Sequence, residues 1–134
     1  MTGPTILVIE DNPLNLELAR DVLEAAGYTV VDARTAEEGL RLAEAVMPNL
    51  ILLDIRLPGM NGFDAVRNLK QDVRTRDIPV VALTAQAMAG DEQTAFGAGF
   101  DGYITKPINT RTLSGDVRRW LESPQAERER RRGA

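Results

Sequence analysis

One stretch decides the fold: Asn49-Leu50-Ile51-Leu52-Leu53-Asp54-Ile55-Arg56-Leu57-Pro58-Gly59-Met60-Asn61-Gly62. Four consecutive apolar residues lead straight into a carboxylate and then into a turn-rich loop. A run of this length between turn residues is typical of a strand buried on both faces, as in a parallel sheet. Asp54 then lies at the carboxyl end of the strand, where open α/β sheets bind their ligands. On this stretch alone, Asp54 is either a loop cap or a chemically active group.

Strand-like and helix-like segments alternate along the rest of the chain. Short apolar runs predict strands at residues 5–9, 28–32, 50–54, 78–83 and 102–105. Helical spacing, N-caps and breakers predict helices from Asn12 to Gly27, from Thr35 to Pro48, from about Gly62 to Val73, over 86–98, and from Asn109 to Ser123. Five alternating pairs imply an α/β fold, with a parallel five-stranded sheet covered by helices on both faces.

The composition is that of one globular domain. The chain has 134 residues, of which 43% are hydrophobic and 27% charged, and this suits a single core. We assign residues 1–123 to the domain. The charged segment 124–134 is low in apolar residues, so we expect it to be disordered.

Two residue types are absent from the chain, and their absence excludes several functions. The chain has neither cysteine nor histidine, which excludes disulfides, Ser-His-Asp catalysis and zinc sites built from these ligands. The net charge is −4, and residues 127–134 contribute +2 to it, which leaves −6 for the body. An acidic body argues against a nucleic-acid surface. No apolar run approaches the roughly 20 residues that span a bilayer, so we expect a cytoplasmic protein without a membrane partner.

Polar side chains follow four of the five predicted strands. They are Glu10 and Asp11, Asp54, Thr84 and Lys106. Because the carboxyl ends of parallel strands meet at one edge, these groups are expected to line one cleft. Three carboxylates alone would repel one another, and a hard divalent cation removes that conflict. Oxygen ligands without His or Cys select Mg²⁺, with Mn²⁺ as a possible substitute.

Such a cleft suits phosphoryl transfer. A metal ion and Lys106 neutralise the oxygens of a transferring phosphoryl group, and Thr84 donates a hydrogen bond to one of them. Asp54 is then the in-line nucleophile, which forms an aspartyl phosphate. The sequence has no Gly-x-x-x-x-Gly-Lys-Ser/Thr loop, so ATP is not expected to be the donor.

These motifs resemble the receiver domains of bacterial two-component response regulators. The matching pieces, which cover about residues 5–122, are Glu10-Asp11, Asp54 with Pro58 and Gly62, Thr84-Ala85, Tyr103, and Lys106-Pro107. The resemblance implies the CheY-like, flavodoxin-like (βα)5 fold with strand order 2-1-3-4-5. Residues 8–12 and 90–92 are similar to the branch of stand-alone DivK-like regulators and to receivers of hybrid kinases.

The resemblance also implies roles for the residues of the cleft. Asp54 corresponds to the phosphoacceptor, which is also a metal ligand. Asp11 corresponds to the direct Mg²⁺ ligand, Glu10 to a ligand acting through water, and Arg56 to the position whose backbone carbonyl binds the metal. Here the first acidic residue is Glu rather than the commoner Asp, which lengthens its reach.

Further roles follow from the same resemblance for the fourth and fifth strand ends. Thr84 and the Ala85 amide correspond to contacts with the phosphoryl group, and Lys106 to the catalytic cation. The bond between Lys106 and Pro107 is expected to be cis. Thr84 and Tyr103 correspond to the pair that switches conformation on phosphorylation.

Two positions at the mouth of the cleft are expected to set the lifetime of the phosphate. In the family, the residue at Arg56 and the residue at Gln86 influence how fast the phosphoryl group is lost. Arg56 is a long cation and departs from the commonest pattern, so the lifetime, and not the chemistry, is the open property of this chain.

The leading hypothesis is a single-domain response regulator. It would take a phosphoryl group from a phosphohistidine on a histidine kinase or phosphotransfer protein, as a phospho-acceptor that catalyses its own phosphorylation and dephosphorylation rather than as an enzyme. No segment after Ser123 could form an output domain, so the output is expected to be contact with a downstream protein. We expect a monomer or a weak, phosphorylation-linked dimer.

Two alternatives come from other functional classes. A small flavodoxin-like protein would bind FMN through a Ser/Thr/Gly-rich loop after the first strand, but this chain has Glu10-Asp11-Asn12-Pro13 there. A Mg²⁺-dependent phosphatase with Asp54 as nucleophile usually needs a second acid two residues later, where Arg56 stands.

Overall fold

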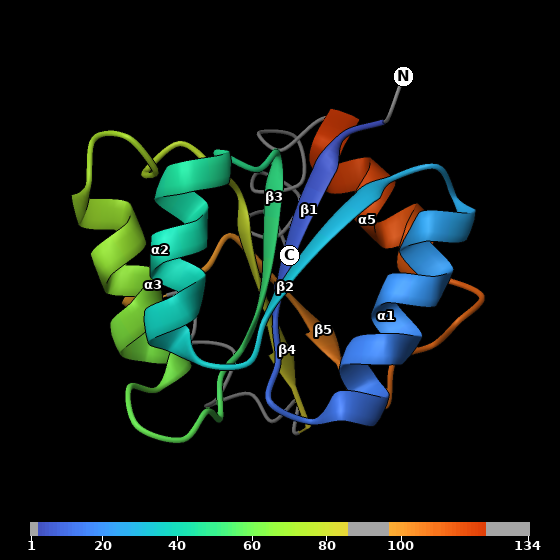
Figure 1. Cartoon of the computed structure of the whole chain (residues 1–134), viewed down its shortest axis with the longest axis horizontal. Helices are drawn as coiled ribbons and strands as arrows, with labels where there is room; N and C mark the ends of the chain where they lie inside the picture. Colours follow the sequence, from blue (N-terminus) through green and yellow to red (C-terminus); the bar gives the residue numbers. More distant parts are fainter. Residues whose placement is uncertain (1–2, 86–96, 123–134) are drawn as a thin grey trace.

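The computed structural model describes residues 3–85 and 97–122. Five strands form one parallel sheet of order β2-β1-β3-β4-β5, which confirms the predicted fold class and strand order. The strands are β1 (Thr5–Ile9), β2 (Thr29–Ala33), β3 (Leu50–Asp54), β4 (Val80–Thr84) and β5 (Gly102–Thr105). The helices of the described part, labelled as in Figure 1, are α1 (Pro13–Ala25), α2 (Ala36–Val46), α3 (Gly62–Gln71) and α5 (Leu113–Glu122).

The helices cover both faces of the sheet. Figure 1 shows α2 and α3 on one side of the sheet and α1 and α5 on the other. Successive strand residues point to opposite faces, so β3 contributes Ile51 and Leu53 to the core under α2 and α3, and Leu50 and Leu52 to the core under α1 and α5. Every residue of β3 is buried, which confirms the prediction for this stretch.

Cap residues fix where the first two helices begin. The side chain of Asn12 accepts hydrogen bonds from the backbone N–H groups of Leu14 and Asn15, and Pro13 occupies the first helical position of α1. Thr35 caps α2 by accepting from the N–H of Glu38. Both caps agree with the sequence predictions.

The third helix ends earlier than its apolar spacing predicts. Asp72 is extended, and its side chain accepts a hydrogen bond from the backbone N–H of Arg74, which forms a turn in place of another helical residue. Val73, which the apolar spacing assigns to the helix, therefore lies beyond α3 and is 71% exposed.

Two further boundaries differ from the sequence predictions. β4 begins at Val80 and not at residue 78, because the nitrogen of Pro79 has no hydrogen to donate to a neighbouring strand. The Pro79 carbonyl still accepts a hydrogen bond from the Ile51 N–H. Asn109 does not cap α5: its side chain accepts from the Arg111 N–H in a turn, and the helix begins at Leu113. Most of the helix predicted over 86–98 and the tail at 124–134 lie outside the described residues.

Among the described helices, none has the length and apolar character that crossing a membrane requires.

Candidate functional site

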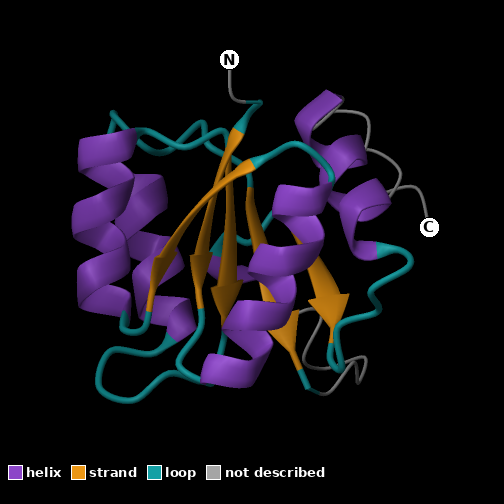
Figure 2. Cartoon of the chain, turned by 45° about the vertical axis from the view of Figure 1, so that its right-hand side comes forward, coloured by secondary structure: helices purple, strands orange, loops and turns teal. Residues whose placement is uncertain are grey.

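The carboxyl ends of the strands meet at one edge of the sheet, as Figure 2 shows by the common direction of the arrows. β3 lies between β1 and β4 and pairs with both, with Ile9 of β1 opposite Leu53 and Leu83 of β4 opposite Asp54. Glu10 follows β1 immediately, and its N–H donates to the Ala33 carbonyl of β2. Parallel register therefore brings side chains that are far apart in sequence to one place.

Three carboxylates gather at this edge. One oxygen each from Glu10, Asp11 and Asp54 lies within 4.8 Å of the others. Glu10 is 0% exposed and Asp54 4% exposed, whereas Asp11 is half-buried. The sequence prediction that these acids share one cleft thus agrees with the structure. Buried like charges at this spacing require a cation to stay ionised together.

Lys106 supplies one such cation. Its Nζ donates to Oδ2 of Asp54 at 2.9 Å and lies 2.7 Å from Oε1 of Glu10. Burial alone would lower the pKa of Lys106, but pairing with Glu10 and Asp54 outweighs burial and raises the pKa above its ordinary value. Lys106 therefore stays charged at neutral pH. The peptide bond from Lys106 to Pro107 is cis.

Backbone geometry orients Asp54 from the other side. The N–H of Arg56 donates to Oδ1 of Asp54 at 2.9 Å. With Lys106 on Oδ2, each oxygen of this carboxylate has a donor, which fixes the rotation of the side chain. Asp54 held this way does not cap the next helix, α3, which is capped by Asn61.

Glu10 is a fully buried member of the cluster, and its pKa is shifted. Burial, with the neighbouring Asp54 adding to it and Lys106 opposing it, raises the pKa of Glu10 from 4.5 to about 7. The contact with Lys106 is an ion pair without hydrogen-bond geometry, so within the described part of the chain both buried Glu10 oxygens lack a hydrogen-bond donor. A buried carboxylate in this state has capacity for a cation.

The donor set fits a hard divalent cation. Its members are carboxylate oxygens, one of them from the fully buried Glu10, and the described residues at the site include no nitrogen or sulfur ligand. Such oxygen sites favour Mg²⁺ or Mn²⁺ over softer metals. The residues thus have the chemistry that the predicted metal requires.

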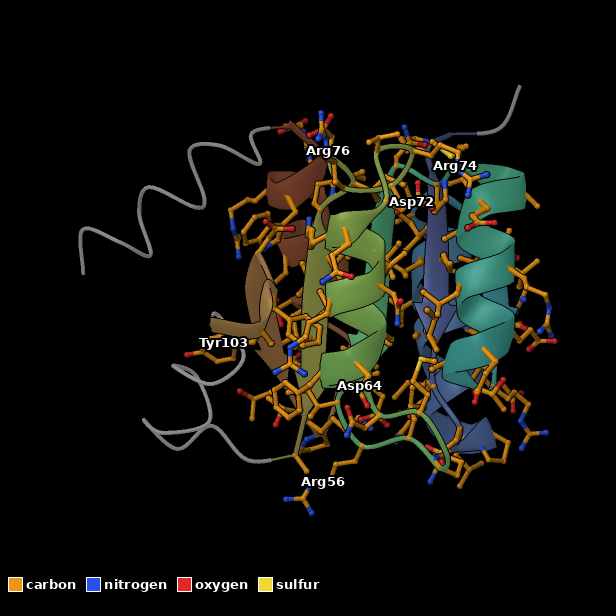
Figure 3. The ribbon with its side chains drawn as sticks, turned by 90° about the vertical axis from the view of Figure 1, so that its left-hand side faces the viewer. Arg56, Asp64, Asp72, Arg74, Arg76 and Tyr103 are labelled. Atoms are coloured by element: carbon orange, nitrogen blue, oxygen red, sulfur yellow. The ribbon has the colours of Figure 1, made fainter. Side chains whose placement is uncertain are left out.

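A cleft of about 530 Å³ opens beside Asp54. It is lined by Asp11, Ile55, Arg56, Leu57, Pro58, Asn61, Phe63 and Thr84. Arg56 is exposed, and Figure 3 shows its side chain extending away from the sheet edge at the start of the loop before α3. The predicted position of Arg56 at the mouth of the cleft agrees with this arrangement.

Gly62 holds the loop between β3 and α3 against the strand end. Its N–H donates to the Ile55 carbonyl at 2.9 Å. A Cβ at this position would lie 2.5 Å from the Asp54 carbonyl oxygen and 2.6 Å from the Ile55 Cα. Only glycine allows so close an approach, which explains the glycine eight residues after Asp54.

The remaining predicted residues lie at the ends of β4 and β5. Thr84 ends β4 and is half-buried on the cleft wall, and Ala85 follows it and is exposed. Tyr103 pairs with Ala82 on the adjacent strand and packs against the core under α2 and α3. Figure 3 shows Tyr103 pointing outward from β5, far from Arg56. Gln86 lies outside the described residues.

Sequence reasoning missed Arg34. The guanidinium of Arg34, from the loop between β2 and α2, donates to the backbone carbonyl of Asp11 at 3.4 Å. The pattern Thr35-x-x-Glu38 predicts the start of α2, but no sequence signal shows which way the preceding side chain points. The apolar lining residues Leu57 and Phe63 were missed for the same reason.

Comparison with protein families and curated proteins identifies the chain. Residues 6–118 match the response regulator receiver domain. The polar-differentiation response regulator DivK of Brucella ovis is 41% identical over 117 residues, which cover 87% of this chain and 95% of DivK. The match to DivK agrees with the similarity to DivK-like regulators inferred from the sequence.

Solved structures give the same result. A receiver domain of a sensor histidine kinase from Pseudomonas aeruginosa, solved with a magnesium ion in its active-site cleft, has a TM-score of 0.84 and 34% identity, covering 91% of this chain and all of that one. The chemotaxis protein CheY4 of Vibrio cholerae has a TM-score of 0.82 and 26% identity, covering 87% of this chain and 97% of that one. The chain therefore belongs to the response regulator receiver domain family, whose members accept phosphoryl groups in two-component signalling.

Proposed function

We propose that Asp54 accepts the phosphoryl group, and that the donor is a phosphohistidine on a histidine kinase or histidine phosphotransfer protein. One observation carries the proposal: Asp54 is almost fully buried next to the cleft-lining residues Ile55 and Arg56, with both of its oxygens held by donors and two further carboxylates within 4.8 Å. An aspartate that only caps a helix needs neither this burial nor neighbouring carboxylates.

The reaction can be written with the residues of this chain. A carboxylate oxygen of Asp54 attacks the phosphorus in line with the bond to the donor imidazole. The new O–P bond forms as the P–N bond breaks, and the electron pair stays on the imidazole nitrogen, which takes up a proton. Lys106 neutralises negative charge on the phosphoryl oxygens, and Thr84 and the Ala85 N–H donate hydrogen bonds to them.

Glu10, Asp11, Asp54 and the backbone carbonyl of Arg56 would hold the Mg²⁺ ion, with Mn²⁺ as a possible substitute. Glu10 would act through water, since it lies deepest in the site. The bound cation would supply neutralising charge for the phosphoryl oxygens. The Glu10 oxygens, which accept no hydrogen bond within the described part of the chain, support this assignment, and the related Pseudomonas receiver holds magnesium in its cleft.

The same site would also return the phosphoryl group to water. Such a protein catalyses its own phosphorylation and dephosphorylation but does not turn over a separate substrate, so it is not classed as an enzyme. Arg56 at the cleft mouth and Gln86 would set the lifetime of the phosphate by controlling the approach of water.

Phosphorylation would then change contacts with a downstream protein through Thr84 and Tyr103. Thr84 lies at the cleft, and Tyr103 lies on the adjacent edge strand, two residues before the position that pairs with Thr84. A shift of Thr84 toward the phosphoryl group would free space for the aromatic ring. We place the protein in the cytoplasm, as a monomer or weak phosphorylation-linked dimer, with residues 1–123 as the functional domain and no direct contact with nucleic acid.

Intact mass after incubation with Mg²⁺ and acetyl phosphate tests the proposal. Wild type is expected to gain the mass of one phosphoryl group, and Asp54→Ala none. Asp64→Ala, which removes an exposed carboxylate from the first turn of α3, serves as the control and is expected to be phosphorylated like wild type. A phosphoryl group on Asp54→Ala would refute the assignment.

A further inference from the structure

The loop that carries Asp11 is tied to its neighbour by a residue outside the carboxylate cluster. Arg34 directly follows β2 and donates through Nη2 to the backbone carbonyl of Asp11 at 3.4 Å. The two loops start side by side, because Ile9 pairs with Ala33 and the Glu10 N–H donates to the Ala33 carbonyl. Arg34 thus reaches from one strand end across to the next.

The base of this arm is itself fixed. The backbone N–H of Arg34 donates to Oε1 of Glu38 at 3.1 Å, while the Glu38 N–H donates to the Thr35 hydroxyl at 3.1 Å. These reciprocal bonds form a variant of the capping box on the first turn of α2. The helix therefore anchors the backbone of Arg34, and less freedom is lost when its side chain meets Asp11.

We propose that Arg34 is a positioning residue, which holds the Asp11 loop in the geometry that divalent-cation binding requires. The inference rests on the proposed metal site and adds to it a contact from outside the ligand set. Loss of a partner that orients a metal ligand commonly weakens metal binding by about 10- to 100-fold. Arg34 makes its contact with a backbone carbonyl, so it would set the path of the loop rather than the charge of the Asp11 carboxylate.

A positioning role and a simple charge effect predict changes of opposite sign. Arg34 is a cation near a cation site, so by Coulomb's law its removal should tighten Mg²⁺ binding slightly. Loss of the contact with the Asp11 carbonyl should instead loosen the loop and weaken binding. The direction of the change in affinity therefore distinguishes the two.

The test measures the Mg²⁺ dissociation constant of the unphosphorylated chain by titration followed through its amide NMR signals. Arg34→Ala is expected to weaken binding by about 10-fold, the lower end of the effect of losing an orienting partner. Arg34→Lys keeps a donor and a charge and is expected to stay within about twofold of wild type. Arg41→Ala removes a positive charge from the exposed face of α2 and should leave the constant unchanged.

Four results would overturn the inference. These are unchanged binding in Arg34→Ala, tighter binding in it, an equal loss in Arg41→Ala, or a loss in Arg34→Lys as large as in Arg34→Ala. Should Arg34→Ala fail to fold, Arg34→Gln, whose side chain is too short for the carbonyl, takes its place with the same expectation. Failure of the metal site itself would look different, because wild type would then show no Mg²⁺ titration.

Discussion

Lys106 is the residue that lets two buried carboxylates share one site. Its Nζ contacts both Glu10 and Asp54, and its raised pKa keeps it charged. The same charge is placed where negative charge would gather on a transferring phosphoryl group. Its structural role and its proposed chemical role therefore draw on one property, a fixed ammonium in a poorly solvated cleft.

Replacing Lys106 by Met is expected to slow phosphorylation of Asp54 by acetyl phosphate by at least about 100-fold, the usual effect of losing one preorganised charge. Mass spectrometry of samples quenched over time gives the rate. Lys70→Met is the matched control, because Lys70 of α3 is also paired with a buried aspartate, but Asp101 directly precedes β5, at the end of the strand away from Lys106. Equal rates for wild type and Lys106→Met would rule out its chemical role.

Glu10 makes the stability of the metal-free protein depend on pH. Its pKa is about 7 in the folded chain against 4.5 ordinarily, so the folded state holds the extra proton between these values. The free energy of unfolding is therefore highest at pH values near 4.5 and below. It falls as the pH rises through about 7, by at most about 3 kcal/mol. Urea unfolding in chelator at pH 5 and pH 8 measures the difference.

Glu10→Gln should remove most of this pH dependence, whereas Glu17→Gln, on the exposed face of α1, should retain it. Addition of Mg²⁺ at pH 8 should restore stability to the wild type, because the cation binds the ionised folded state. A metal-free wild type that becomes more stable from pH 5 to pH 8 would show that Glu10 is not the dominant titrating group.

At the scale of the element, the loop between β3 and α3 sets the shape of the cleft. It follows Asp54, carries Arg56, and returns at Gly62 to the end of β3, where the Gly62 backbone packs against the backbone of Asp54 and Ile55. The position of the loop follows from this close approach and from the Asn61 cap on α3. Asn61 and Gly62 therefore fix the position of the loop residues that line the cleft.

Gly62→Ala is expected to lower stability by about 1–3 kcal/mol, as for other substitutions that force an atom into filled space, and to slow phosphorylation, because the displaced backbone includes the Asp54 carbonyl. Urea unfolding and the acetyl phosphate assay measure the two effects. Gly115→Ala, which meets open space on α5, is the control. Normal stability together with a normal rate in Gly62→Ala would contradict the proposed constraint.

A second constraint lies at the amino end of β4 and β5. Lys70 of α3 donates to Asp101 at 2.8 Å and to the carbonyl of Ile78 at 2.9 Å, and Asp101 also accepts from the Val80 N–H. Figure 3 shows that this end of α3, near Asp72 and Arg76, lies opposite the end that faces Arg56. The ion pair joins α3 to the edge of the sheet.

Lys70→Met alone should cost about 3 kcal/mol, because it removes the ammonium that pairs with the buried Asp101 carboxylate. The double variant Lys70→Met/Asp101→Asn should cost less than the sum of the two single variants. A double-mutant cycle by urea unfolding measures this coupling. Strict additivity would mean that the pair does not act as a unit.

At the scale of the whole molecule, the alternating pattern of strands and helices was enough to predict the fold class. Runs such as Leu50–Leu53 are apolar on both faces, and only a sheet covered twice buries them, which leaves little choice of architecture. Strand ends then place Glu10, Asp54 and Lys106 together without any knowledge of side-chain contacts. The strand order itself came from the resemblance to receiver domains.

Details that depend on local polar contacts could not be predicted. The end of α3 is set by the Asp72 side chain and not by apolar spacing, and the start of α5 is delayed by a turn at Asn109. Arg34 was missed because its contact is with a backbone carbonyl, which has no sequence signature. The spacing of apolar residues indicates which positions are buried, but it does not indicate these local hydrogen bonds.

In the phosphorylated chain, the phosphoryl group is expected to reside on Asp54. Reduction of the phosphorylated chain with borohydride converts an acyl phosphate on aspartate into homoserine, which peptide mass spectrometry locates. We expect homoserine at position 54, dependent on both Mg²⁺ and acetyl phosphate. Homoserine at Asp11 or any other aspartate, or a phosphorylated chain that yields none, would contradict the account.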